Sequence, residues 1–131
     1  MRAVARRRGG YTHDVEIEGD HTLVIDEPEA SGGTDEGPSP TRTLAAALAA
    51  CVAITVEMYA DRKGWEVGDV EVVVDMEYGE ANRPRAFTVT LRLPQGLSEE
   101  QVQRLKAIAG KCPIHRMLDE GVEMTDRVEV V

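Results

Sequence analysis

The chain has 131 residues, of which 42% are hydrophobic and 4% aromatic, so we expect one domain spanning residues 1–131 with an aliphatic core. It carries 15 Lys and Arg against 24 Asp and Glu, and this net charge of -9 argues against nucleic acid or an anionic membrane as the main partner. Neither an apolar signal segment nor an unbroken run of about 18 apolar residues is present, so we expect no membrane-spanning segment and a cytoplasmic location.

Charge is unevenly distributed in the N-terminal part of the chain. Residues 2–8 contain four arginines, whereas residues 14–36 contain nine acids and no Lys or Arg. Val15 and Ile17 alternate with acids before a Gly19-Asp20 turn, a pattern typical of a β-hairpin. We therefore expect a basic strand beside a solvated acidic hairpin. The alternative is a basic arm that reaches an acidic surface on a partner subunit.

A Gly/Pro-rich loop leads into the longest predicted helix. Ser39 is suited to cap this helix, Pro40 to occupy its first position, and Gly64 to end it after Lys63. Side chains at helical spacing form one broad face, which contains Leu44, Leu48, Cys51, Val52, Thr55, Val56 and Tyr59. The alanines around Cys51 keep this face narrow, so another element can pack very close to it.

The next segment has the alternating pattern of two half-buried strands. Apolar residues alternate with polar ones from Val70 to Tyr78 and again from Phe87 to Leu93. Asn82-Arg83-Pro84 is suited to turn one strand into the other. The pattern indicates an antiparallel sheet with one covered face.

Two shorter helices and a last strand complete the predicted order. A capping-box pattern at Ser98 begins one helix, which Gly110 ends, and Pro113 permits a further helix over 113–120. Valine-rich residues 122–131 predict a closing strand. Strands grouped in blocks around helices favour an α+β fold, with helices packed on antiparallel sheet.

The two cysteines come from different predicted helices. Cys112 precedes a helix start and has Lys111 and Arg116 nearby, which predicts a lowered thiol pKa, although a buried, unreactive Cys112 is equally compatible with the sequence. Cys51 lies mid-helix among apolar residues, which favours a core role unless the fold brings a cation or donor to it. Because cytoplasmic thiols are kept reduced, the pair is suited to a redox cycle in which one sulfur attacks and the other resolves.

Metal binding is a rival interpretation of the same residues. Cys112 and His115 have the spacing of a ligand pair, and Cys51 could supply a third ligand. His13 and His21 belong to no second paired motif, so we expect neither a metal nor another cofactor.

With both cysteines placed, the chain resembles the OsmC/Ohr family. The resemblance rests on Asp26-Glu27-Pro28, Gly32-Gly33, Gly37-Pro38-Ser39-Pro40, Ala47-Leu48-Ala49-Ala50-Cys51 and Ile108-Ala109-Gly110-Lys111-Cys112-Pro113-Ile114-His115-Arg116. The Cys-Pro-x-His-Arg form is more similar to the OsmC-like branch than to the organic-hydroperoxide-resistance branch. The resemblance implies an intertwined homodimer, in which antiparallel sheets from both subunits wrap around long central helices.

The resemblance also implies a thiol-dependent peroxidase of the oxidative-stress response, acting on organic hydroperoxides, with hydrogen peroxide as a second candidate substrate. By position, Cys51 would attack the peroxide and Cys112 would resolve the oxidised sulfur, in an active site shared by the homodimer. A dithiol such as a lipoyl group would regenerate the pair, and no metal or haem would take part.

Two departures from the family pattern concern the groups that activate the attacking thiolate. Relatives have Arg after the N-terminal Gly-Gly pair and Glu near the start of the long helix, whereas this chain has Tyr11 and Thr41-Arg42. Arg42 and Arg8 are therefore the candidate supporting cations. The departures leave open a redox-sensing or small-ligand-binding protein with a degenerate site, and a structural dimer whose cysteines are core residues.

Overall fold

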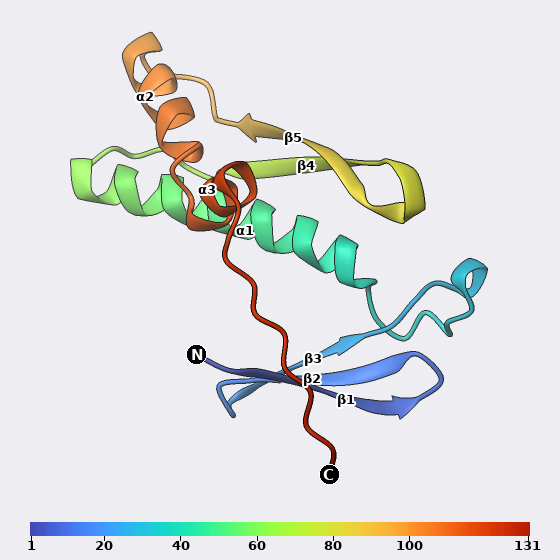
Figure 1. Cartoon of the computed structure of the whole chain (residues 1–131). Helices are drawn as coiled ribbons and strands as arrows, with labels where there is room; N and C mark the ends of the chain where they lie inside the picture. Colours follow the sequence, from blue (N-terminus) through green and yellow to red (C-terminus); the bar gives the residue numbers. More distant parts are fainter. The chain divides into compact units, whose positions relative to one another are not determined.

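The computed structural model describes residues 1–131 and has the predicted α+β class (Figure 1). Its elements are β1 (Ala3–Gly9), β2 (Thr12–Ile17), β3 (His21–Ile25), η1 (Glu29–Ser31), α1 (Pro40–Lys63), β4 (Glu71–Tyr78), η2 (Glu80–Asn82), β5 (Pro84–Arg92), α2 (Glu99–Ala109) and α3 (Pro113–Glu120). The chain divides into two compact units. We call Met1–Ala46 with Met76–Ala86 the N-terminal unit, and Ala47–Asp75 with Phe87–Val131 the cysteine unit.

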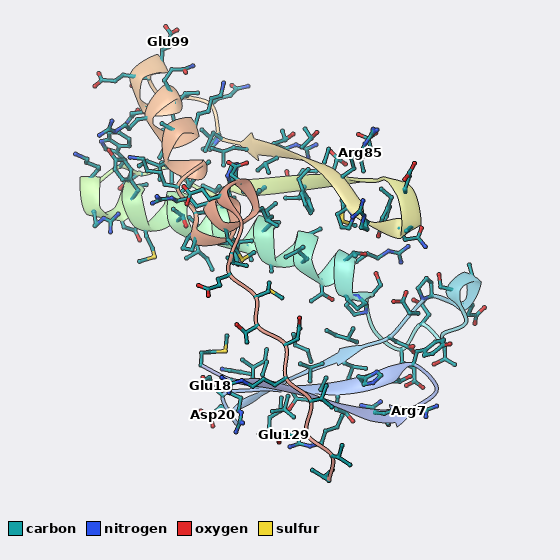
Figure 2. All side chains as sticks on the ribbon, viewed as in Figure 1. Arg7, Glu18, Asp20, Arg85, Glu99 and Glu129 are labelled. Atoms are coloured by element: carbon teal, nitrogen blue, oxygen red, sulfur yellow. The ribbon has the colours of Figure 1, made fainter.

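The N-terminal unit contains the antiparallel sheet β1-β2-β3. Its basic first strand pairs with its acidic second strand, and an ion pair joins Arg6 to Glu16 at 3.0 Å. Charged side chains such as Arg7 and Glu18 extend from this sheet (Figure 2). The expected basic strand beside an acidic hairpin is therefore confirmed.

A buried carboxylate organises the loop between β3 and α1. Asp26, only 1% exposed, accepts hydrogen bonds from the Thr12 and Thr34 hydroxyls at 2.9 and 2.8 Å. The amides of Glu27, Thr34 and Glu36 donate to the same carboxylate at 2.7, 3.3 and 3.2 Å. Burial by itself would raise the pKa of Asp26, but these hydrogen bonds outweigh it and hold the pKa well below its usual range.

We expect Asp26→Asn to lower the melting temperature by several degrees near neutral pH, because an amide side chain cannot accept from all of these donors. Since the folded-state pKa is depressed, the carboxylate contributes stability above its unfolded pKa of about 4. That contribution is lost as the pH falls below this value. Thermal unfolding should show that the difference in melting temperature between wild type and variant becomes smaller towards about pH 3. Asp20→Asn, at an exposed position (Figure 2), is the control.

Two glycines allow the same loop to approach its neighbours closely. A Cβ atom at Gly33 would overlap the Glu27 carbonyl, and one at Gly37 would overlap the Val24 carbonyl. The amide of Asp26 donates to the carbonyl of Pro38 at 3.2 Å, so the two ends of the loop are joined. The loop thereby delivers the chain directly to the first turn of α1.

Helix α1 begins and ends as the sequence predicts. The Ser39 hydroxyl accepts a hydrogen bond from the Arg42 amide at 3.4 Å, and Gly64 ends the helix with a φ of 68°. Within the cysteine unit, buried α1 side chains pack with buried residues of α2: Leu48, Val52, Val56, Tyr59, Ala60, Leu105, Ile108 and Ala109. Apolar residues of β4 and β5 pack against this core: Val72, Val74, Phe87, Val89 and Leu91.

By length and composition alone, α1 could also cross a membrane. An unbroken apolar run is nevertheless absent, because Thr55 and Glu57 interrupt it. Core helices of soluble proteins pass the same test, and here Val52 and Val56 are completely buried within the protein. Membrane-like composition therefore reflects a core helix as readily as a membrane span.

The last two helices form as predicted, but the closing strand does not. Ser98 and Gln101 make a reciprocal capping box, and Pro113 begins α3. Residues 122–131 form no strand, and Val128 and Val130 are 91% and 97% exposed. A strand requires a hydrogen-bonded neighbour, and this segment pairs with no strand of its own chain.

Candidate active site

The two cysteines lie in the same unit and at the same hydrophobic core cluster. Cys51 is on α1 and is partly exposed, whereas Cys112 is completely buried. Both are free thiols, and Cys51 packs against the core cluster that contains Cys112. The neighbouring Cys51 contributes, after burial, to raising the pKa of the Cys112 thiol. The structure therefore brings together the pair selected from the sequence.

The chain around Cys112 places its sulfur at a helix start. Gly110 ends α2, and Cys112 is the N-cap residue of α3 with Pro113 in the first helical position. The Cys112 Sγ accepts a hydrogen bond from the His115 amide at 3.4 Å. This sulfur therefore caps a helix, and it also belongs to the thiol pair.

Burial and the neighbouring Cys51 thiol raise the pKa of Cys112. Backbone amides at the start of α3 act in the opposite direction but do not compensate. The expectation of a lowered pKa, drawn from the helix terminus and the adjacent Lys111 and Arg116, is therefore wrong. Both cationic residues are solvent-exposed, whereas the sulfur is inside the core, where its charged form is disfavoured.

We expect iodoacetamide to label Cys51 faster than Cys112 in the native, reduced protein, because only Cys51 has solvent access. The raised pKa keeps Cys112 protonated at neutral pH. The rate constant for labelling Cys112 should therefore still increase with pH above pH 9. Peptide mass spectrometry over time measures both rates. Labelling in urea is the control, since it removes the protection of Cys112. Equal native rates would contradict the arrangement.

The two candidate supporting arginines belong to the N-terminal unit, although Arg42 lies in the first turn of α1, the helix that also carries Cys51. Arg8 hydrogen-bonds Asp14 through Nε at 3.2 Å, and its Nη1 lies 3.5 Å from a carboxylate oxygen of Glu36. This guanidinium is therefore occupied by acids of its own unit. Arg42 is exposed in the first turn of α1, where its amide completes the Ser39 cap.

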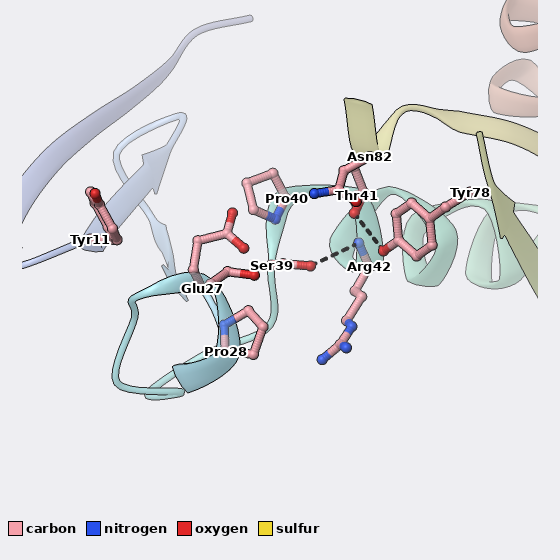
Figure 3. A pocket seen from close by; sticks show the side chains of 10 residues that line it. Tyr11, Glu27, Pro28, Ser39, Pro40, Thr41, Arg42, Tyr78 and Asn82 are labelled. Carbon is pink, nitrogen blue, oxygen red and sulfur yellow. Dashed lines mark hydrogen bonds between the residues drawn. The ribbon is translucent and has the colours of Figure 1, made fainter. Parts of the chain in front are cut away.

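Arg42 lines an open hollow of about 610 Å³ in the N-terminal unit (Figure 3). Tyr78 and Glu27 line the same hollow, and the Tyr78 hydroxyl lies 2.9 Å from the Thr41 Oγ1. Sequence reasoning missed Tyr78, because it lies 37 residues from Thr41 and no spacing rule connects them. Thr41, in the first turn of α1, is thus hydrogen-bonded to a phenol.

Comparisons with known proteins agree with this architecture. The family model described as OsmC-like protein matches residues 33–125, and the chain belongs to this family. No curated protein gives a significant match.

Solved structures extend the likeness to the fold. A putative osmotic stress induced and detoxification response protein from Psychrobacter arcticus has a TM-score of 0.78 at 18% identity, covering 87% of this chain and 85% of that one. An organic hydroperoxide resistance protein OsmC from Legionella pneumophila has a TM-score of 0.62 at 23% identity, covering 94% and 93%. The organic hydroperoxide resistance protein OhrB of Bacillus subtilis has a TM-score of 0.59 at 26% identity, covering 94% of each chain.

Proposed function

We propose that this protein is a cysteine-based peroxidase that reduces organic hydroperoxides through Cys51 and Cys112. The observation that carries the proposal is that the partly exposed Cys51 packs against the core cluster that holds the completely buried Cys112. The names of the Legionella and Bacillus relatives support the substrate class. Reduction of organic hydroperoxides protects the cell against oxidative stress.

The reaction divides between the two sulfurs. The Cys51 thiolate attacks one oxygen of the O–O bond, the other oxygen leaves with a proton as an alcohol, and Cys51 becomes a sulfenic acid. The Cys112 thiol gives up its proton as its sulfur attacks the Cys51 sulfur and displaces hydroxide. The proton and the hydroxide form water, and a disulfide remains. A dithiol reductant of the lipoyl type reduces this disulfide and is itself oxidised to a disulfide.

Accessibility supports this order of events. Peroxide arriving from solvent meets Cys51 first, because Cys112 is enclosed by the core. A protonated, buried Cys112 is a poor target for direct oxidation, since the thiolate is the reactive form. It is therefore preserved for the second step.

Adding one equivalent of cumene hydroperoxide to the reduced protein should convert both thiols into one intramolecular disulfide. Intact mass spectrometry should show the loss of two hydrogens, and thiol titration should show no free thiol. Cys112→Ser is the matched variant, and it should instead retain an oxidised Cys51 that a sulfenic-acid reagent labels. Two titratable thiols after peroxide treatment would contradict the proposal.

The proposal includes a cytoplasmic, intertwined homodimer with a shared site, in which each chain acts as one OsmC-like domain. Apolar side chains exposed on α1, Ile54 and Met58, support a second copy as the partner. Residues 122–131 have alternating apolar side chains but no partner strand in their own chain. We therefore propose that this segment pairs with sheet of the second copy.

Deleting residues 122–131 should reduce the dimer fraction at micromolar concentration, because a strand that adds to a partner's sheet contributes its hydrogen bonds only in the dimer. Sedimentation velocity of wild type and truncated protein measures the change. The control is Glu129→Gln, whose charged side chain lies in the same segment (Figure 2) but leaves the apolar alternation intact. A monomeric wild type would contradict the proposed dimer. A truncated protein with the same dimer fraction as wild type would contradict the proposed strand pairing.

A redox-sensing or ligand-binding protein on the same fold is the second candidate. It is favoured by Thr41-Arg42 at the helix start, where the family resemblance leads us to expect Glu, and by an Arg8 held by Asp14 and Glu36. Under this candidate, one equivalent of hydroperoxide still forms the disulfide. Dihydrolipoamide then supports no repeated turnover, which distinguishes a sensor from the peroxidase.

A further inference from the structure

The cysteine unit contains an open hollow of about 560 Å³ whose lining includes neither cysteine. The last turns of α1 contribute Tyr59 and Lys63, and Trp65 follows directly after that helix. Helix α2 contributes Glu100 and Arg104, which are one turn apart. The lining thus combines two aromatic rings with charges of both signs.

Positive charge gathers around the Tyr59 ring. The Arg104 Nε donates to the Tyr59 hydroxyl at 2.8 Å, and the guanidinium carbon lies 5.8 Å from the ring centre. The Lys63 Nζ lies 5.7 Å from the same centre. The Arg104 hydrogen bond lowers the pKa of Tyr59, and the charges of Arg104, Lys63 and Lys111 act in the same direction. The cluster of positive charges around Tyr59 therefore differs in sign from the net charge of the chain, which is -9.

The same hollow has an apolar wall. Trp65 stands edge-on to Tyr59 at a ring-centre distance of 5.8 Å, and Ala107 adds a methyl group. Lys63 and Arg104 are both exposed residues, and their charged groups lie over the Tyr59 ring at one side of this wall. The hollow therefore offers cationic hydrogen-bond donors beside a surface on which an apolar group can be buried.

We propose that this hollow binds a small monocarboxylate that carries an aromatic or aliphatic body. Lys63 and Arg104 would receive the carboxylate, and Trp65 with Ala107 would cover the apolar part. Glu100 lines the same hollow and leaves one net positive charge there, which one carboxylate neutralises, whereas a dianion would lose more hydration and leave a negative charge uncompensated. The proposal is independent of peroxidase activity, because neither sulfur takes part.

Trp65 is the only tryptophan of the chain, so its fluorescence reports directly on the hollow. Benzoate should change this fluorescence along a saturable curve. Benzamide, which has the same ring and no charge, should give no saturable change, and the dianion phenyl phosphate should bind more weakly than benzoate. No saturation with benzoate, or equal curves for benzoate and benzamide, would overturn the proposal. Phenyl phosphate binding as tightly as benzoate would overturn the preference for a monocarboxylate.

Four glutamine variants test the roles of the charges. Arg104→Gln should weaken benzoate binding about tenfold through loss of a charge-assisted hydrogen bond, whereas Glu100→Gln should strengthen it. Lys106→Gln, which removes a positive charge from α2 outside the lining, should leave binding unchanged. Circular dichroism checks that each variant folds.

Since Arg104 also bonds Tyr59, Lys63→Gln provides a second test that breaks no hydrogen bond. Equal affinities for Arg104→Gln, Lys63→Gln and Lys106→Gln would overturn the assignment.

Discussion

Replacing Cys51 with serine is expected to reduce turnover of cumene hydroperoxide with dihydrolipoamide at least about a thousandfold, because a hydroxyl is a far weaker nucleophile towards the O–O bond than a thiolate. The change removes only the sulfur from a partly exposed position on α1, so the fold should be retained. Peroxide consumption under steady-state conditions measures the loss. Wild type and variant consuming peroxide at the same slow rate would contradict the assignment of Cys51 as the attacking residue.

Cys112→Ser is the matched control for this experiment, because it removes the resolving sulfur and leaves the attacking one. Its first turnover should proceed at the wild-type rate, and later turnovers should fail. Excess hydroperoxide should then drive Cys51 to a sulfinic acid, since no second thiol traps the sulfenic acid. A variant that cycles as fast as wild type would show that Cys112 is not required for resolution.

Leu105→Ala is expected to lower the free energy of unfolding by about 2–5 kcal/mol, the range for a buried leucine truncated to alanine. Leu105 is completely buried on α2, within the core cluster that contains Cys112. Urea unfolding followed by circular dichroism measures the change. Val102→Ala on the same helix, at a side chain 36% exposed, should lower the free energy of unfolding much less. Similar losses for both variants would contradict the assignment of the core.

The elements whose ends depend on neighbouring residues were predictable from the sequence. Ser98 caps α2 because its partner Gln101 is three positions away, and Gly64 ends α1 because it can adopt a positive φ. The position of Cys51 on the apolar face of α1 likewise follows from helical spacing, as its packing against the core shows. Such features involve few residues, which lie close together along the chain.

Features that depend on tertiary surroundings were not predictable. The helix start at Cys112 favours a low pKa, but burial by residues distant in sequence reverses the direction. Arg104 bonds Tyr59 across 45 positions, a contact with no local pattern. The alternation in residues 122–131 is typical of a strand, yet alternation specifies no partner, and the chain supplies none. In each of these cases, the property of the residue depends on which groups the fold places around it.

The closed base of the loop before α1 allows the outer part of the loop to vary while the start of the helix stays fixed. The Asp26 amide is bonded to the Pro38 carbonyl, so the place where α1 begins depends on the base of the loop and not on its outer part. Exposed positions such as Glu29 and Ala30 should therefore tolerate substitution, and even added residues, without moving the helix. Homologues can consequently diversify the outer part of this loop while the helix that presents Cys51 stays in register.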